Sequence, residues 1–138
     1  PEELEGRLAQ VAGYLASREG SVLVFVPDKR CTVRLAREIA EEAGLPPAEG
    51  VADELSLLGR TEPTEATEFL TELTRQGVAF HNADLRFEER AALEQGFARG
   101  ELSVLVCTST LSTGVNLPAR NVLVDVRRWS RLRPGVGA

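Results

Sequence analysis

The segment "VLVCTSTLSTGVNLPARNVLVDV", residues 104 to 126, places two apolar runs on either side of a polar loop that contains a glycine. The run at 104 to 107 is continuous and rich in valine, which is typical of a parallel strand buried on both faces, and residues 121 to 126 predict a further strand. Polar residues begin at Thr108, directly after the first run. Ligands bind beside the carboxyl ends of strands in open α/β sheets, so this loop is a candidate binding site.

The residue types in the loop suit a phosphate-containing ligand. Thr108, Ser109 and Thr110 offer hydroxyl groups. Gly114 lets a backbone approach closely, and Asn116 provides both a donor and an acceptor. The same hydroxyls could instead cap a helix that follows the strand. The segment alone therefore leaves two interpretations open, a polar binding site and a simple strand-to-helix connection.

Helical periodicity and short apolar runs alternate along the rest of the chain. The spacing of Leu4, Leu8, Val11 and Leu15 predicts an amphipathic first helix, and Asp28 is a candidate N-cap for the second. Residues 44 to 65 are rich in proline and glycine and are expected to form a loop with one short helix. The predicted helices span residues 2–18, 28–43, 64–75 and 86–98, and the predicted strands span residues 21–26, 78–81, 104–107 and 121–126.

This alternation predicts the α/β class, a three-layer sandwich in which helices flank a mostly parallel sheet. A length of 138 residues suits one domain, and residues 127–138 are expected to form a tail. No stretch is apolar enough to cross a membrane and no signal-like start is visible, so we expect a cytoplasmic protein without a membrane partner. Two cysteines and one histidine are too few for a disulfide framework or a zinc site.

Charge is distributed unevenly between the two halves. Residues 1 to 72 contain 15 acids and 7 bases, whereas residues 73 to 138 contain 6 acids and 9 bases. The basic excess thus shares a half with the hydroxyl-rich loop, which favours a nucleic-acid phosphate backbone as partner, although solvated surface arginines would give the same pattern.

Several enzyme classes are excluded by missing motifs. The chain contains no Gly-x-Gly-x-x-Gly, no P-loop and no Gly-x-Ser-x-Gly elbow, which argues against a self-contained NTPase, a dinucleotide enzyme or a serine hydrolase. A thiol enzyme based on Cys107 would need a phosphate loop of glycine and arginine directly after it, so Cys107 is expected to be a core residue.

The segment "GVAFHNADLRFEERAALEQGFARGELSVLVCTSTLSTGVNLPAR", residues 77 to 120, resembles the second RecA-like lobe of superfamily 2 helicases, in particular the Ski2-like group with the Hel308-type enzymes. Within it, "TSTLSTGVNLPA" is similar to motif V of that group. "VAFHNADL" and "VLVFVPDKR" resemble its flanking strand motifs. The resemblance covers most of the chain except residues 44 to 65 and the tail.

The resemblance implies roles for the loop residues. Thr108 and Ser109 would contact a phosphate of single-stranded DNA or RNA, supported by Thr110. Gly114 and Asn116 would face ATP at the cleft between this lobe and a first RecA-like lobe of the same chain. ATP and Mg²⁺ are cofactors of such full-length helicases, and none is expected to bind the isolated domain, in which no residue is assigned a catalytic role.

Two further residues match family positions. His81, at the end of a predicted strand, would lie near the nucleic acid, although a packed core histidine explains it equally well. Arg90 would also lie near the nucleic acid, with a plain surface salt bridge as the alternative.

Departures from the family pattern matter as well. Asn82-Ala83-Asp84 stands where the family often has His-Ala-Gly, and the carboxylate would repel phosphate. Asp28 replaces a serine or threonine, which puts a phosphate contact through Lys29 or Arg30 in doubt. Motif VI with its arginine finger is not found, so we expect no ATP hydrolysis by these 138 residues alone. A helicase-like lobe that serves as a protein-interaction scaffold, with the acidic half as its contact face, is the alternative function.

Overall fold

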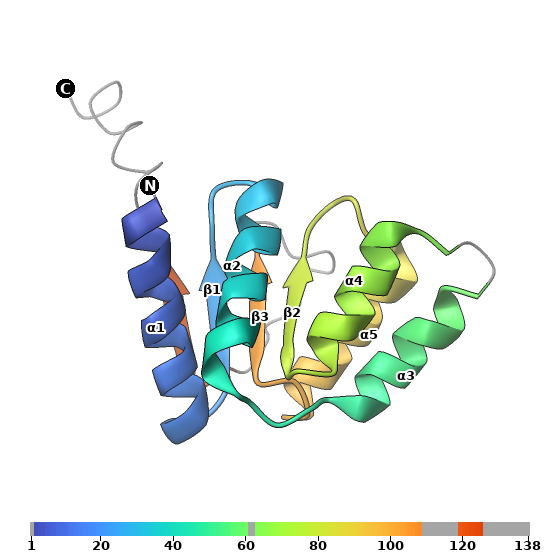
Figure 1. Ribbon diagram of the computed structural model, residues 1–138. Helices are drawn as coiled ribbons and strands as arrows, with labels where there is room; N and C mark the ends of the chain where they lie inside the picture. Colours follow the sequence, from blue (N-terminus) through green and yellow to red (C-terminus); the bar gives the residue numbers. More distant parts are fainter. Residues whose placement is uncertain (1, 61–62, 109–118, 126–138) are drawn as a thin grey trace.

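The computed structural model describes residues 2–60, 63–108 and 119–125, with side chains from Arg7 onward. The order of helices and strands is as predicted, including the short helix within residues 44 to 65. The predicted tail at 127–138 lies outside the described residues. The elements are α1 Glu2–Arg18, β1 Val22–Phe25, α2 Lys29–Ala43, α3 Glu49–Leu58, α4 Glu65–Thr74, β2 Val78–His81, α5 Phe87–Ala98, β3 Val104–Cys107 and β4 Asn121–Val124 (Figure 1).

The four strands form one sheet in the order β2-β3-β1-β4, and every neighbouring pair is parallel. Val24 of β1 lies opposite Val106 of β3 on one side and Leu123 of β4 on the other. The predicted α/β class is therefore confirmed. Because all strands run the same way, their carboxyl ends share one edge, which is at the top of Figure 1.

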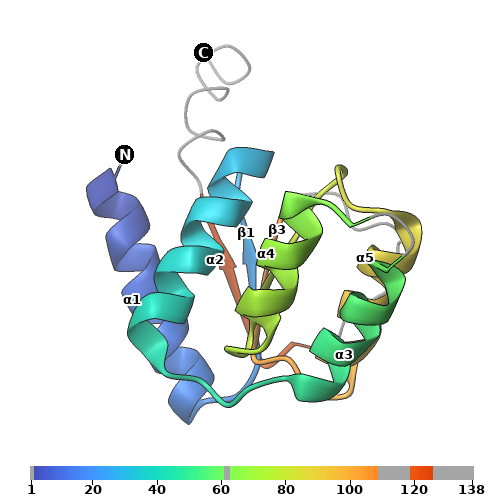
Figure 2. The same ribbon diagram turned by 45° about the vertical axis from the view of Figure 1, so that its right-hand side comes forward.

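Helices cover both faces of the sheet. The ring of Phe80 in β2 lies 6.3 Å from that of Phe69 in α4, whereas the next residue, His81, points to the opposite face and reaches Glu94 of α5. Helices α1, α2 and α4 lie in front of the strands in Figure 1, and α5 lies behind α4. Helix α3 packs against α4 and α5, as the turned view in Figure 2 shows.

Helix α1 packs through small residues and through part of the predicted stripe, since Leu8 and Leu15 are partly buried against the core. Ala9 and Ala12 are buried, whereas Val11 is 46% exposed. A Cβ placed on Gly13 would lie 3.0 Å from the Cβ of Ala43, so α1 and α2 approach each other closely. The close approach brings the small residues to the interface and turns Val11 outward. The prediction that Val11 faces the core was therefore wrong.

Helix α2 begins where its sequence predicts. Asp28 has an extended backbone (φ −148°) and its Oδ1 accepts a hydrogen bond from the backbone N–H of Cys31 at 3.0 Å, which is an N-cap. This hydrogen bond from Cys31 lowers the pKa of the Asp28 carboxyl below its usual value. The cap fixes the first turn of α2 at the carboxyl edge of the sheet.

Candidate nucleic-acid interface at the carboxyl edge

Thr108 lies in the middle of the carboxyl edge. It follows β3, which lies between β2 and β1, and its side chain is half-buried. Its backbone N–H points to the carbonyl oxygen of His81 at an N···O distance of 3.4 Å, which extends the pairing of β3 with β2 by one residue. Thr108 is thus the first polar residue beyond the strand, as predicted. Ser109, Thr110, Gly114 and Asn116 lie outside the described residues, so their roles stay predictions.

His81 is a packed histidine in this structure. Its side chain is 1% exposed, and its Nε2 lies 2.7 Å from Oε2 of Glu94, which is also buried. Its other ring nitrogen, Nδ1, has no hydrogen-bond partner among the described residues. The structure thus places His81 beneath the edge, bonded to α5, and its contact with nucleic acid stays a prediction.

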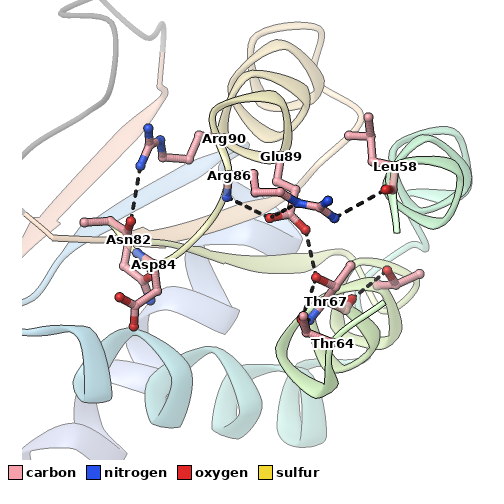
Figure 3. A network of polar contacts seen from close by, with 10 residues as sticks. Leu58, Thr64, Thr67, Asn82, Asp84, Arg86, Glu89 and Arg90 are labelled. Carbon is pink, nitrogen blue, oxygen red and sulfur yellow. Dashed lines mark hydrogen bonds and ion pairs between the residues drawn. The ribbon is translucent and has the colours of Figure 1, made fainter. Parts of the chain in front are cut away.

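Arg90 holds the loop that follows β2. Its Nη1 donates to the carbonyl oxygen of Ala83 at 3.4 Å, and its Nε is buried without a hydrogen-bond partner among the described residues (Figure 3). No ion pair of Arg90 is found in the described part of the chain, so the surface salt bridge considered for it is replaced by a backbone contact. The half-buried guanidinium lies at the same edge as Thr108.

The unusual residues after His81 form a defined turn. Asn82 is buried, and its Nδ2 donates to Oγ1 of Thr32 in α2 at 3.1 Å. The Oδ1 of the same side chain accepts from the backbone N–H of Asp84 at 3.0 Å. Asparagine side chains commonly close turns in this way. Asn82 thus joins the loop to α2 and sets the position of Asp84.

Asp84 and Lys29 form an exposed ion pair. The Nζ of Lys29, the first residue of α2, lies 2.9 Å from Oδ1 of Asp84, and the two side chains are 54% and 68% exposed. The pair therefore joins the segments that follow β1 and β2, the two strands on either side of β3. From the sequence, Lys29 was considered as a phosphate ligand and Asp84 as a charge that repels phosphate, each without the other. Nothing in the sequence links these two positions, which lie 55 residues apart.

A buried carboxylate fixes the start of α5. Glu89 accepts from Oγ1 of Thr67 at 3.0 Å and from the backbone N–H of Arg86 at 2.8 Å. Arg86 in turn donates from Nη2 to the carbonyl oxygen of Leu58 at 3.3 Å, so α3, α4 and α5 meet here (Figure 3). The sequence analysis missed this network. The available signal was Glu89, three residues after the N-cap position Arg86, which is the spacing of a capping box.

Cys107, the last residue of β3, is a core residue as predicted. Its side chain is fully buried and its Sγ lies 3.6 Å from the carbonyl oxygen of Val24. Burial, with a smaller contribution from the charge of Glu94, raises the pKa of the thiol to about 12. The thiolate is the nucleophilic form of cysteine, so this position does not support thiol chemistry.

Within the described ranges, no group of three or more histidine, cysteine, aspartate and glutamate side chains is arranged to hold a metal ion. None of the helices in those ranges combines the length and the apolar character needed to cross a bilayer. The described polar chemistry of the edge thus consists of hydroxyl, amide, guanidinium, ammonium and carboxylate groups from three segments, after β1, β2 and β3.

A parallel sheet covered by helices on both faces, with polar segments gathered at its carboxyl edge, defines a RecA-like α/β lobe. Residues 55–133 match the family described as the helicase conserved C-terminal domain. The chain belongs to this family, as a C-terminal lobe of the Ski2-like, Hel308-type group of superfamily 2 helicases.

Its relatives include enzymes named ATP-dependent DNA helicase Hel308. The chain is 43% identical over 129 residues to that of Pyrobaculum calidifontis and 36% identical over 121 residues to that of Methanococcus vannielii, matches that cover 86% and 83% of this chain. It is also 38% identical over 123 residues, 75% of its length, to DNA polymerase theta of Mus musculus. The matches span 17% and 16% of the two Hel308 proteins and 5% of the polymerase.

Proposed function

We propose that this chain is the second motor lobe of an ATP-dependent DNA helicase and that the carboxyl edge of its sheet contacts a single DNA strand. The observation that carries the proposal is the convergence of three segments at one edge. Thr108 follows β3, the loop from Asn82 follows β2, and α2 begins after β1. Loops at this edge of an open α/β sheet are where such folds bind ligands.

The contacts proposed for the strand are of the positioning type. The hydroxyl of Thr108 would donate to a phosphate oxygen, and the hydroxyls of the next two residues, Ser109 and Thr110, would do the same. Such contacts hold the strand in position without reading its bases. Arg90 would act beside them, because its guanidinium is at the same edge and already holds the loop at Ala83. A DNA rather than an RNA strand is proposed because the similar Hel308 proteins are named DNA helicases.

The nucleotide part of the proposal concerns the full-length protein. Gly114 and Asn116 would line the ATP cleft opposite a first RecA-like lobe. Among the described residues no acidic cluster suits Mg²⁺, so the donor set present here does not fit that ion and no step of hydrolysis is assigned to it. We accordingly expect the 138 residues alone to bind DNA and not to turn over ATP.

Equilibrium titration of a labelled single-stranded oligonucleotide at two salt concentrations tests the strand-binding part. Each phosphate that the protein neutralises lowers log affinity by roughly 0.7 per log unit of salt, so two or three contacts predict weak binding with a shallow slope. A phosphate-release assay with ATP and Mg²⁺ tests the second part. Steady hydrolysis by this chain would contradict the proposed division of labour.

The protein-interaction scaffold is the competing function. The net charge of −5 slows encounter with a polyanion and is the observation in its favour. Absence of oligonucleotide binding at the lowest salt would support the scaffold and remove the helicase-lobe proposal. The cytoplasmic location predicted from the sequence stays a prediction.

A further inference from the structure

We infer that Asn82 and Thr32 are positioning residues of the strand-binding edge. The hydrogen bond between their side chains joins the loop after β2 to the first turn of α2, so that both segments meet the DNA strand as one preformed surface. The inference rests on the proposed function, because it needs a strand at this edge. Its basis is the 3.1 Å contact from Asn82 Nδ2 to Thr32 Oγ1, between residues that are 4% and 0% exposed.

The two side chains belong to a chain of hydrogen bonds with a defined direction. Thr32 Oγ1 donates its single hydrogen to the carbonyl oxygen of Lys29 at 2.6 Å, so it can only accept from Asn82. The amide group of Asn82 supplies that hydrogen, and its Oδ1 in turn accepts from the backbone N–H of Asp84 at 3.0 Å. The chain of hydrogen bonds thus connects the loop backbone at Asp84 with the α2 backbone at Lys29.

A second contact joins the same two segments, but it lies in solvent. Lys29 and Asp84 form an ion pair whose side chains are 54% and 68% exposed. Exposed ion pairs contribute little because water and salt compete with them. Asn82 and Thr32 are buried, where a hydrogen bond is stronger and an unmade one is costly. The buried contact is therefore the one that holds the two segments together.

A fixed connection between these segments favours the binding of an extended strand. Thr108 follows β3, which lies between β1 and β2, so a DNA strand crossing the edge would meet all three segments. Segments that move independently must be ordered when the ligand binds, and this ordering lowers the affinity. The contact between Asn82 and Thr32 makes the ordering part of folding. Asn82 departs from the family's His-Ala-Gly pattern, and Thr32 is its partner within this chain.

Five variants of the 138-residue chain test this inference: Thr32→Val, Thr32→Ser, Asn82→Ala, the double variant Thr32→Val with Asn82→Ala, and Thr74→Val as control. Thr74 is also fully buried, and its hydroxyl donates to the carbonyl oxygen of Leu70 within α4, which ends at the amino edge of the sheet. Its variant therefore removes a comparable buried hydroxyl without touching the carboxyl edge. Binding of a labelled single-stranded DNA oligonucleotide is measured at two salt concentrations, and thermal unfolding confirms that each variant is folded.

We expect Thr32→Val and Asn82→Ala to weaken binding roughly two- to tenfold, the range in which the ordering of one side chain lowers affinity. The salt slope should not change, because no charge is removed. Thr32→Val should have no further effect in the Asn82→Ala background, since the contact is already lost there. Thr32→Ser keeps the hydroxyl and should retain the affinity of the unaltered chain.

The control separates positioning from a general loss of stability. Thr74→Val should lower the unfolding temperature and leave DNA binding unchanged. Unchanged binding by Thr32→Val, an equal loss in Thr74→Val, or losses that add in the double variant would overturn the inference while leaving the proposed function standing. If the unaltered chain does not bind at the lowest salt, the proposed function itself fails and this inference fails with it.

Discussion

His81 Nε2 lies 2.7 Å from Glu94 Oε2, and the two side chains are only 1% and 7% exposed. This contact ties the last residue of β2 to the middle of α5 on the face of the sheet opposite α4. It also places a buried polar pair directly beneath Thr108, whose N–H points to the His81 carbonyl oxygen. The edge that we propose for the DNA strand is thus supported from below by a polar contact inside the core.

Replacing Glu94 by alanine should therefore destabilise the fold. The change removes the partner of His81 Nε2 and leaves a buried polar atom without a hydrogen bond, which costs roughly 1–3 kcal/mol. Gln95, the next residue of α5, is exposed, so Gln95→Ala is the matched control and should change stability by less than about 0.5 kcal/mol. Denaturant unfolding measures both. Equal stabilities of the two variants would show that the pair contributes nothing.

The Asp28 cap predicts a pH-dependent effect. Asp28→Ala should lower the free energy of unfolding by roughly 1 kcal/mol at neutral pH, through loss of the hydrogen bond to the Cys31 N–H. The folded state lowers the pKa of this carboxyl below its usual value of 3.8. Its contribution is therefore fully present above that value and is lost as the pH falls through the lower, folded-state pKa.

Asp28→Asn serves as the control for the cap, because asparagine caps helices equally well but does not titrate. The difference between wild type and Asp28→Ala should shrink in acid, whereas the difference between Asp28→Asn and Asp28→Ala should not. Unfolding measured at neutral and at acidic pH separates the two. A difference for the wild type that is the same at both pH values would contradict the assigned cause.

Two glycines with the same backbone angle offer a test of packing at the amino edge of the sheet. Gly77 and Gly100 both have φ +83°, but a Cβ on Gly77 would meet the carbonyl oxygen of Pro46, whereas one on Gly100 would meet nothing within 4 Å. Gly100→Ala should cost roughly 1 kcal/mol for the left-handed conformation alone. Gly77→Ala should cost at least about 1 kcal/mol more, because of the clash. Equal unfolding midpoints for Gly77→Ala and Gly100→Ala would show that the segment at Pro46 moves aside at no energetic cost.

The order of elements and the fold class followed from local patterns in the sequence. Continuous apolar runs such as 104 to 107 indicated buried strands, and Asp28 before an amphipathic stretch indicated the start of α2. Both depend on neighbouring residues only. Predicting the face of α1 failed at Val11, because the close approach of α1 and α2 at Gly13 is a property of two helices together.

Only one described residue of the candidate site could be located from the sequence. Thr108 was located because it is the first polar residue after a strand. The groups that shape the site pair with residues distant in sequence: Glu89 with Thr67, and Asp84 with Lys29. A single sequence carries no signal for such pairs, so the loop after β2 was interpreted as a departure from the family pattern and not as a built turn.

A chemical-shift titration of the ¹⁵N-labelled chain with a short single-stranded DNA locates the strand-binding surface residue by residue. If the DNA strand binds at the carboxyl edge, salt-sensitive shifts should be confined to Thr108, to residues 82–86 and to the start of α2 near Lys29. Amides at the amino edge, such as Gly77 and Gly100, should stay in place. Shifts that gather at the amino edge or along α1, or the absence of shifts at low salt, would contradict binding at the carboxyl edge.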